Sequence, residues 1–329
     1  MTVLVTGGAG YIGSHMVLAL IDAGEQVVVV DDLSNGFRWA VHPKAELIVG
    51  DAADQELVGR IIKARGIDAI THFAARIVVP ESVADPLGYY FANTVKTRAL
   101  FSAAVASGVK HLIFSSTAAV YGTPETNPVT EAAPPHPESP YGTSKLMSEW
   151  MLRDAASAHG LGYVVLRYFN VAGADPDGRS GQSTPNATHL IKVCCEAALG
   201  LRPGVSVFGT DFPTPDGTGV RDYIQVTDLV AAHLDALRHL RGGGASLTLN
   251  CGYGRGYSVL EVIDTVKRVS GVDFPVTMAP RRLGDPAAIV AGADRIRAEI
   301  GWRPRFDDLS VIVAQALAWE RKLAERCAA

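Results

Sequence analysis

A glycine-rich turn directly after the first apolar run is the feature that most limits how this chain can fold. Residues 2–6 (TVLVT) form a short β-branched run, and TGGAGYIGSH then places glycines at positions 7, 10 and 13. Glycines at this spacing permit a tight strand-to-helix turn and let the helix terminus present its N–H groups to a pyrophosphate. The turn predicts a dinucleotide site, with a glycine-rich turn that binds nothing as the alternative.

The second apolar run favours the dinucleotide interpretation. Residues 26–32 (QVVVVDD) contain Asp31, ~20 residues beyond the glycines, where a carboxylate can bind a ribose 2′-hydroxyl. Such a carboxylate repels a 2′-phosphate, and Asp32 and Asn35 add no cation beside it. The sequence therefore predicts NAD rather than NADP, and Arg38 is the one nearby residue that argues against this preference.

Short β-branched runs alternate with longer periodic segments throughout the first half of the chain. This is the βαβ pattern of a parallel sheet with helices on both faces, whose strands read as continuous apolar runs. We expect an α/β fold, a Rossmann-type doubly wound parallel sheet with a smaller α/β substrate-binding C-terminal lobe. The predicted domains are residues 1–170 and 171–329, with a segment of roughly 219–245 crossing back, and residues 246–250 (SLTLN) are assigned to the smaller lobe.

Two irregular stretches interrupt this pattern, residues 123–140, rich in proline, and residues 171–187, rich in Gly, Asp, Ser and Pro. Long irregular loops in a compact domain often carry function. Asp51 ends the third apolar run (ELIVGD) and has the right placement for the adenine edge of a dinucleotide. A loop or helix-capping aspartate is the alternative for this position.

Composition argues against several classes of partner. The net charge is -4 without basic clusters, so we expect no nucleic-acid or anionic-membrane partner. No apolar run approaches the ~18 residues of a membrane span, and the start lacks the basic flank of a signal peptide, so we expect a cytoplasmic protein. Cys194, Cys195, Cys251 and Cys327 show no CxxC spacing and are interpreted as reduced, packed residues rather than a metal or redox site.

The segment YGTSK places Tyr141 and Lys145 on one face of a predicted helix. A phenol with a pKa of ~10 is a poor base, and lowering that pKa by ~3 units requires about 4 kcal/mol of phenolate stabilisation. The Lys145 ammonium, a bound nicotinamide cation and a dry site could supply this together. Thr117 follows an apolar run (HLIFSS), so it lies at the carboxyl end of a parallel strand, where doubly wound folds bind ligands.

These motifs together resemble the extended short-chain dehydrogenase/reductase superfamily. Within it, further segments resemble the UDP-glucose 4-epimerases, in order along nearly the whole chain. They are HFAA, VPES, DPLGYY, SPYGTSKLMSE, LRYFNVAGA, THLI, TGVRDYIQVTDL and APRRLGDPAA. The resemblance implies NAD-dependent 4-epimerization of UDP-glucose and UDP-galactose through a transient 4-keto sugar, a role in galactose metabolism, and a homodimer.

The resemblance also implies a role for individual residues. Tyr141 takes the proton of the sugar 4-hydroxyl while C4 gives its hydride to NAD, Thr117 hydrogen-bonds the reacting oxygen, and Lys145 supports the phenolate. The implied cofactor site comprises Gly7, Gly10, Tyr11, Ile12, Gly13, Asp31, Asp32, Asn35, Gly36, Asp51, Ala52, Phe73, Ala74, Ala75, Asn93, Ser115, Tyr141, Lys145 and Phe169. The implied substrate site comprises Thr117, Asn170, His189, Leu190, Phe208, Arg221, Arg282, Asp285 and Ile289. The alternative for each of these residues, taken singly, is a packing residue or a member of a surface ion pair.

The chain departs from the family pattern beside the cofactor site. Familiar bacterial members have HFAGLK where this chain has HFAARI, so Ala75 and Ile77 replace a glycine and a lysine. Arg76 is not expected to replace that lysine, because a neighbouring position points elsewhere. Ile289 stands where the family limits sugar C2 substituents, and its intermediate bulk leaves UDP-N-acetylglucosamine open as a substrate. UDP-xylose and UDP-arabinose stay open as well.

Three alternatives to epimerization differ in the residues or the cofactor behaviour that they require. A nucleotide-sugar 4,6-dehydratase needs an additional acid and base near C5 and C6, and the family places that pair where this chain has Ala118 and Ala119. A simple dehydrogenase or reductase exchanges its reduced cofactor with solution. A non-enzymatic NAD-binding protein predicts a damaged catalytic set, whereas Thr117, Tyr141 and Lys145 are all present.

Overall fold

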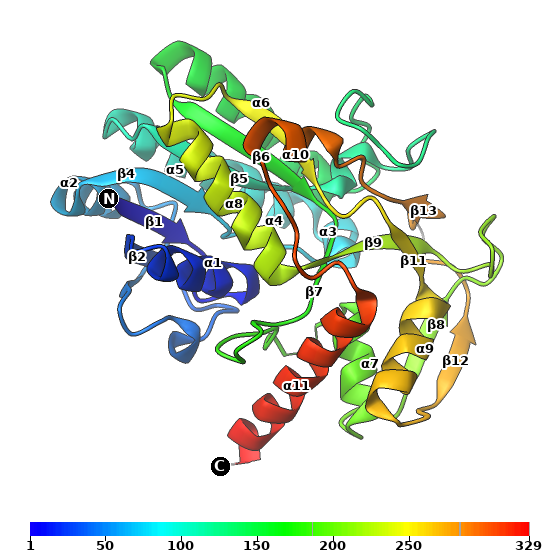
Figure 1. The fold of residues 1–329 in the computed structure, drawn as a ribbon. Coiled ribbons are helices and arrows are strands. Elements are labelled where there is room, and N and C mark those ends of the chain that lie inside the picture. Colours follow the sequence, from blue (N-terminus) through cyan, green and yellow to red (C-terminus); the bar gives the residue numbers. More distant parts are fainter. Residues whose placement is uncertain (186, 283, 329) are drawn as a thin grey trace.

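The computed structural model describes residues 1–185, 187–282 and 284–328, and Figure 1 shows their arrangement. A seven-stranded sheet forms the larger part of the molecule, in the order β10-β6-β5-β4-β1-β2-β3 with all neighbours parallel. The strands are β1 (Thr2–Thr6), β2 (Gln26–Asp31), β3 (Glu46–Val49), β4 (Ile67–His72), β5 (His111–Thr117), β6 (Gly162–Tyr168) and β10 (Leu247–Cys251). The order 3-2-1-4-5-6 is the doubly wound arrangement that the sequence predicts.

Helices cover both faces of this sheet, because alternate side chains of each strand enter two different cores. Val3 and Val5 pack in one core with α1 (Tyr11–Asp22) and α8 (Val226–Arg241), whereas Leu4 packs in the other. The helices of the opposite face are α2 (Gln55–Arg65), α5 (Lys96–Ala106) and α6 (Pro140–His159). The shorter helical segments are η1 (Arg38–Ala40) between β2 and β3, then α3 (Val79–Ala84), α4 (Pro86–Tyr90) and η2 (Phe91–Val95) before α5, and η3 (Ala118–Tyr121) directly after β5.

A smaller lobe lies beyond the carboxyl end of the large sheet. Its central strand β9 pairs with β7, β11 and β13, and β8 pairs with β12. Figure 1 shows α7, α9 and the C-terminal helix α11 on one side of these strands. The elements are β7 (Asn170–Ala172), β8 (Val205–Phe208), β9 (Val220–Gln225), β11 (Gly256–Ser258), β12 (Val276–Ala279), β13 (Ala288–Ile289), α7 (Leu190–Ala198), α9 (Val259–Ser270), α10 (Asp294–Ile300) and α11 (Leu309–Ala328).

One strand lies in a different sheet from the one expected. Residues 246–250 were assigned to the smaller lobe, but β10 pairs in parallel with β6 and forms the edge of the large sheet. The assignment was wrong because a short apolar run specifies a strand without specifying its neighbour. The chain thus returns to the large sheet through α8 and β10. The domain division at residue 170, with a returning segment of roughly 219–245, stays a prediction.

Helix α6 begins where its sequence indicates, and this start sets the position of the catalytic candidates. Ser139 is the N-cap, and its hydroxyl accepts a hydrogen bond from the Gly142 backbone N–H at 3.2 Å. Pro140 occupies the first helical position, where its missing N–H removes no intrahelical bond. Tyr141 therefore lies in the first turn and Lys145 one turn later.

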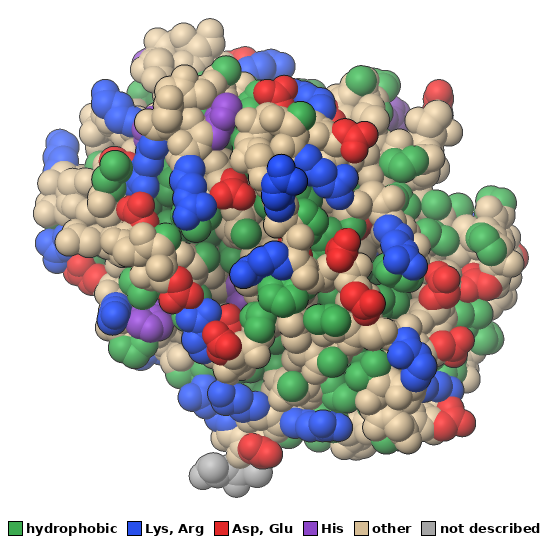
Figure 2. All heavy atoms as spheres, in the orientation of Figure 1, with side chains coloured by type: hydrophobic (Ala, Val, Ile, Leu, Met, Phe, Trp, Pro, Cys, Tyr) green, Lys and Arg blue, Asp and Glu red, His purple; other side chains and the backbone are tan. Residues whose placement is uncertain are grey.

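Within the described residues, no helix is both long and apolar enough to cross a membrane, and no group of three or more His, Cys, Asp or Glu side chains is arranged to hold a metal ion. Figure 2 shows acidic and basic side chains interspersed over the visible face. Cys194, Cys195 and Cys251 are free and buried, as predicted. The side chain of Cys327 lies outside the described part of the chain, as does Leu283 of the segment APRRLGDPAA.

Candidate active site

The three glycines of the first turn differ in what surrounds them. A Cβ on Gly7, whose φ is +73°, would lie 2.6 Å from the Ala74 backbone nitrogen, and a Cβ on Gly13 would lie 2.1 Å from the Gly7 carbonyl oxygen. At Gly10 the nearest atom would be 3.4 Å away, an ordinary contact. The protein's own packing therefore requires Gly7 and Gly13, whereas Gly10 leaves free space in front of the N-terminus of α1.

Asp31 closes this turn from the end of β2. Its carboxylate accepts hydrogen bonds from the backbone N–H groups of Ala9 at 2.9 Å and Leu33 at 2.8 Å. Burial raises the pKa of Asp31, and these two donors oppose that rise. A Cβ on Gly36 would lie 3.0 Å from the same carboxylate, so Gly36 also borders it. Asp31 is therefore fixed at the glycine turn by a backbone donor on each of its two oxygens.

The neighbouring acidic residues have other partners. The Asp32 carboxylate is exposed and accepts hydrogen bonds from the Ser34 hydroxyl and backbone N–H. Asp51 forms an ion pair with Lys96 at 2.6 Å and accepts from the Ala53 N–H at 2.9 Å, beside Ala52. The helix-capping alternative for Asp51 was wrong, because Asp54 is the N-cap of α2. Asn35 is exposed and borders the small cavity over the glycine turn.

The loop after β4 faces the glycine turn and is held by Asn93. The Phe73 N–H donates to the Thr6 carbonyl at 2.9 Å, which places residues 73–75 next to Gly7. The Asn93 side chain accepts from the Arg76 N–H and donates to the Arg76 carbonyl, both at 2.9 Å, and donates to the Ser144 hydroxyl at 3.2 Å. Asn93 thereby ties this loop to α6.

The residues that depart from the family pattern point away from the turn or into solvent. The Arg76 guanidinium forms an ion pair with Asp85 at 2.8 Å and lies 4.4 Å over the Tyr89 ring. Ile77 is half-exposed. Neither side chain offers a charge to the glycine turn.

Thr117 and Tyr141 meet at the carboxyl end of β5. Thr117 is the last residue of the strand, and its hydroxyl accepts a hydrogen bond from the Ala119 N–H at 3.1 Å. Tyr141 faces it from the first turn of α6 and is buried. Burial raises the pKa of Tyr141 to about 12, whereas its hydrogen bond to Thr117 lowers it. With this raised pKa, Tyr141 is a neutral phenol at pH 7 and lies beside the Thr117 hydroxyl.

Lys145 lies behind this pair. Its ammonium donates to the Ser115 carbonyl at 3.1 Å and stands 5.1 Å over the Phe114 ring. Burial lowers the pKa of Lys145 to about 8, and the Glu149 carboxylate opposes that fall. The Ser115 hydroxyl contacts His233 Nε2 at 3.2 Å, so this predicted cofactor residue supports the site through its carbonyl and through α8.

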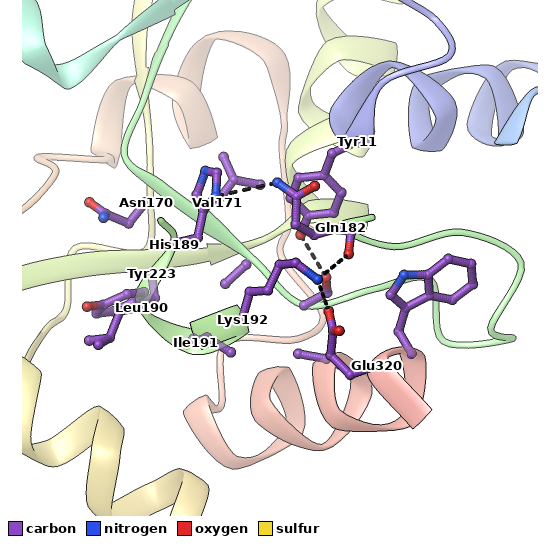
Figure 3. Close-up of a pocket in the computed structure, with 14 residues that line it drawn as sticks. Tyr11, Asn170, Val171, Gln182, His189, Leu190, Ile191, Lys192, Tyr223 and Glu320 are labelled. Carbon is purple, nitrogen blue, oxygen red and sulfur yellow. Dashed lines mark hydrogen bonds and ion pairs between the residues drawn. The ribbon is translucent and has the colours of Figure 1, made fainter. Parts of the chain in front are cut away.

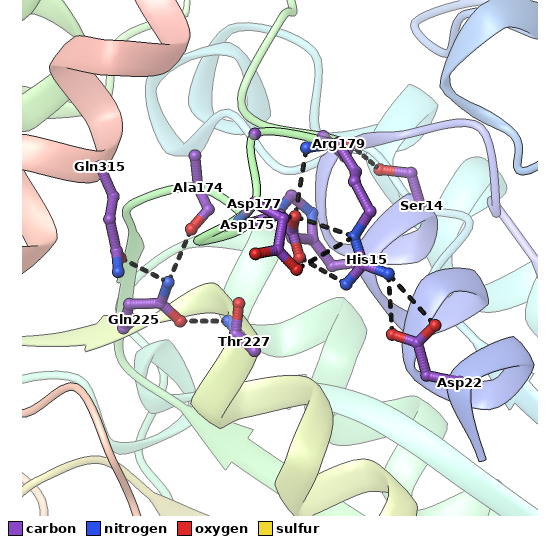
Figure 4. Close-up of polar contacts among 12 residues, drawn as sticks. Ser14, His15, Asp22, Ala174, Asp175, Asp177, Arg179, Gln225, Thr227 and Gln315 are labelled. Carbon is purple, nitrogen blue, oxygen red and sulfur yellow. Dashed lines mark hydrogen bonds and ion pairs between the residues drawn. The ribbon is translucent and has the colours of Figure 1, made fainter.

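The segment after β7 folds back over α1, a contact that sequence reasoning missed (Figure 4). Arg179 forms ion pairs with Asp22, the last residue of α1, and with Asp175, each at 2.8 Å. The hydroxyls of Ser14 and Ser180 lie 2.7 Å apart. Residues 181, 183 and 184 then close the cavity over the glycine turn. The Arg179–Asp22 and Ser14–Ser180 contacts each join residues more than 150 positions apart, so no local pattern could have indicated them.

A second cavity brings predicted cofactor and substrate residues together (Figure 3). Tyr11 lines it from α1, Asn170 from β7, and His189 and Leu190 from the start of α7. The Tyr11 hydroxyl donates to the Gly173 carbonyl at 2.7 Å, which joins the two lobes. Other lining residues that sequence reasoning missed include Gln182, Lys192, Tyr223, Trp319 and Glu320. Phe169 belongs to the hydrophobic core, and the partly buried Ile12 packs against that core.

The remaining predicted substrate residues gather around β9. Arg221 lies in β9 in register with Ile289 of β13. Burial lowers the pKa of Arg221, whereas the nearby Asp285 carboxylate raises it. Arg282 forms an ion pair with Asp285 at 3.0 Å and lies 4.7 Å over the ring of Phe208, at the end of β8. Two guanidinium groups and a half-exposed aromatic ring therefore line this part of the lobe.

Comparisons with known proteins agree with this geometry. The model of the NAD dependent epimerase/dehydratase family matches residues 3–252. The UDP-glucose 4-epimerase of Azospirillum brasilense is 59% identical over 321 residues, which cover 98% of this chain and 92% of that protein.

Two solved structures are also similar over nearly the whole chain. The UDP-glucose-4-epimerase of Stenotrophomonas maltophila with bound NAD and formylated UDP-arabinopyranose is 40% identical, with a TM-score of 0.95 and 99% of each chain covered. The UDP-Glc/GlcNAc 4-epimerase of Campylobacter jejuni is 46% identical, with a TM-score of 0.85, and the match covers 98% of this chain and 99% of that one.

Proposed function

The chain belongs to the NAD dependent epimerase/dehydratase family, and from this premise we propose that it catalyses the NAD-dependent 4-epimerization of UDP-glucose and UDP-galactose. One observation carries the proposal. Thr117 and Tyr141 meet at the carboxyl end of β5 with Lys145 behind them, and two alanines follow Thr117. This set can move a proton at a sugar hydroxyl, and the alanines supply no further acid or base.

The residues at the glycine turn fit NAD. A Cβ at position 10 would fill space that the protein itself leaves free, and the first N–H groups of α1 have no intrahelical acceptors. This concave backbone with the positive end of a helix suits a pyrophosphate. Asp31 would bind the adenosine ribose, and its negative charge disfavours a 2′-phosphate. When bound, NAD supplies the hydride acceptor and donor for C4 of the sugar.

In the proposed mechanism, three side chains of the site act together to transfer one proton to and from the sugar. Tyr141 would take the proton of the 4-hydroxyl as C4 is oxidised. It would return the proton after the 4-keto sugar has rotated to present its other face. Thr117 would hold the reacting oxygen beside the phenol. The buried Lys145 ammonium, held at the Ser115 carbonyl, favours the phenolate by its charge. Because hydride is removed and returned within one site, the net reaction needs no external oxidant.

The smaller lobe would hold the substrate through its nucleotide. Arg221 and Arg282 present guanidinium groups, which bind pyrophosphate oxygens in pairs. Phe208 offers an aromatic face for the uracil beside them. Asn170, His189 and Leu190 would contact the substrate from the cavity at the lobe junction. Holding the nucleotide leaves the keto sugar free to present its other face.

Dehydration is disfavoured by the same region. Elimination of the C6 hydroxyl needs an acid and a base beyond Tyr141. Ala118 and Ala119 occupy the first positions of η3 directly after Thr117, and a methyl group can provide neither. A dehydratase product would have lost the mass of one water.

Ile289 is the residue that would determine which substituents at C2 of the sugar the site accepts. Its side chain is buried in β13, next to β9, and it has intermediate bulk. The similar Campylobacter jejuni protein is named for both UDP-Glc and UDP-GlcNAc, so an N-acetylated sugar is the second candidate substrate. The test is to incubate the purified protein, without added NAD, with UDP-glucose, UDP-N-acetylglucosamine and UDP-xylose in turn, and to identify epimers by NMR. The proposal predicts that UDP-glucose is converted to UDP-galactose. If none of the three substrates gave an epimer, the proposed activity would be overturned.

The homodimer expected from the family resemblance is supported by an apolar stripe. Leu87, Phe91 and Val95 are spaced four residues apart along α4 and η2, and each is at least half-exposed. Trp150 is also about half-exposed on α6, which packs against the same elements. We propose that a second copy of the chain covers this stripe. A cytoplasmic location stays a prediction from the sequence.

A further inference from the structure

A buried ion pair lies directly behind the catalytic candidates, and nothing in the chemistry above uses it. Arg167 and Glu149 lie 2.5 Å apart, with side chains that are 8% and 7% exposed. Arg167 also donates through Nε to the same carboxylate at 3.0 Å, so the pair is bidentate. Burying two charges is costly, and such a pair often stabilises a protein no better than apolar residues would. Stability alone therefore does not explain why the ion pair is present.

The pair touches both elements that carry the active site. Glu149 follows Lys145 by one turn on the same face of α6. Its carboxylate also accepts a hydrogen bond from the Ser116 hydroxyl, between Ser115, whose carbonyl holds Lys145, and Thr117. A single carboxylate thus joins the catalytic helix to the end of β5.

A hydrogen-bonded chain fixes the pair from the other side. Arg167 donates to the Tyr121 hydroxyl at 3.0 Å, which donates to the Asn250 side chain at 2.7 Å. Asn250 in turn donates to the Val129 carbonyl at 2.9 Å. The guanidinium is therefore held by β10 and by the proline-rich loop, and it holds the Glu149 carboxylate in one place.

The groups around Lys145 come from several elements. Glu149 is the carboxylate that raises the pKa of Lys145 against the effect of burial. His72 on β4 and His233 on α8 are neutral, because burial lowers their pKa values to about 3 and about 4. Phe114 contributes its ring face, Tyr141 its phenol, and Arg167 on β6 a positive charge beyond Glu149.

We propose that Glu149 is a positioning residue of the epimerase, which keeps Lys145 in its ammonium form and in place while Arg167 holds the carboxylate. The inference rests on the proposed function. It assigns a task to a residue that touches neither the substrate nor the cofactor. The charge reaches the reaction only through Lys145 and the phenol of Tyr141.

The test is the pH dependence of kcat. Activity needs the ammonium, so kcat should fall as pH rises through the pKa of Lys145, which burial places at about 8. Glu149→Gln should move this alkaline limb down by about one pH unit, the effect of losing one nearby opposite charge. At pH 8 that shift lowers kcat roughly fivefold, whereas at pH 6.5 kcat should change little.

Three further variants separate this electrostatic effect from a structural one. Glu149→Asp keeps the charge and should restore most of the limb. Tyr121→Phe weakens the same network without removing a charge, so it should lower thermal stability and leave the limb where it is. If Glu149→Gln alone does not fold, the double variant Glu149→Gln, Arg167→Met can be used instead, because it leaves no unpaired buried charge. The alkaline limb of its kcat profile should also lie at lower pH than in the wild type.

An alkaline limb unchanged from wild type in folded Glu149→Gln, or in the double variant, would overturn the inference. A limb that moves equally in Tyr121→Phe would also overturn it, because the network would then act through structure alone. Failure of the proposed function is a different result, since wild-type protein would then show no epimerase activity at any pH.

Discussion

The ammonium group of Lys145 lies 3.1 Å from the carbonyl oxygen of Ser115, and this hydrogen bond joins helix α6 to the carboxyl-terminal end of strand β5. The bond points the charge toward the strand end that presents Thr117. Burial, by contrast, raises the pKa of Tyr141 to about 12. In the proposed mechanism, the phenol therefore depends on charge from the cofactor and from Lys145 before it can act as a base at neutral pH.

Replacing Tyr141 by Phe should abolish proton transfer without removing the ring that packs there. We expect kcat to fall about 10²- to 10⁴-fold, the usual contribution of a general base, while the NAD content of the purified protein is unchanged. Thr117→Val should reduce kcat about tenfold through one lost hydrogen bond, and Thr117→Ser should restore most of it. Near wild-type turnover in Tyr141→Phe would exclude the assigned base.

The glycines of the turn provide a matched pair. Gly10→Ala should leave thermal unfolding close to wild type, because the new Cβ meets only one atom at 3.4 Å, but it should prevent NAD from binding. Gly13→Ala should destabilise the fold itself, since its Cβ would lie 2.1 Å from the Gly7 carbonyl oxygen. Thermal melts and cofactor content of both variants check this. Full NAD content in Gly10→Ala would contradict the assigned pyrophosphate position.

Asp31 should set the preference for NAD over NADP. Asp31→Asn removes the negative charge and keeps one acceptor oxygen, which can serve either the Ala9 or the Leu33 N–H group but not both. We expect NAD affinity to fall roughly tenfold to a hundredfold, the effect of losing a hydrogen bond to a charged group, and discrimination against NADP to shrink. Titration of cofactor-free protein with each dinucleotide measures both. An unchanged NAD-to-NADP ratio would show that this carboxylate does not contact the ribose.

The apolar stripe predicts the effect of one surface charge on assembly. Phe91→Glu should convert a dimer into a monomer in light-scattering measurements, because it places a charge in the proposed interface. Leu201→Glu is the control, since Leu201 is 59% exposed, close to the 57% of Phe91, but lies in the smaller lobe. A wild-type protein that is already monomeric, or a Phe91→Glu variant that stays dimeric, would rule out this interface.

The fold could be predicted where the information is local. The glycine turn, Asp31 and the alternating runs each act within about 20 residues, and together they predict a doubly wound parallel sheet with a dinucleotide site after its first strand. The position of the segment SLTLN could not be predicted in this way. A short apolar run specifies a strand but not the strand beside which it lies, and β10 pairs with β6.

The candidate site shows the same limit. Tyr141 and Lys145 share a helix face because they are four residues apart, and the sequence predicts this directly. Arg167 was a visible signal, a charge inside the apolar run VVLRYF, but its partner Glu149 is 18 residues away on a helix. The contact of Arg179 with Asp22 spans 157 residues, and only the folded chain could reveal it.

The central claim is that hydride leaves and returns to C4 within one site. The measurement is epimerization of UDP-glucose that carries deuterium at C4, in ordinary water and without added NAD, read by NMR of the UDP-galactose formed. The account predicts UDP-galactose that retains deuterium at C4. Deuterium exchanged for solvent hydrogen, or released into free cofactor in proportion to product, would contradict it.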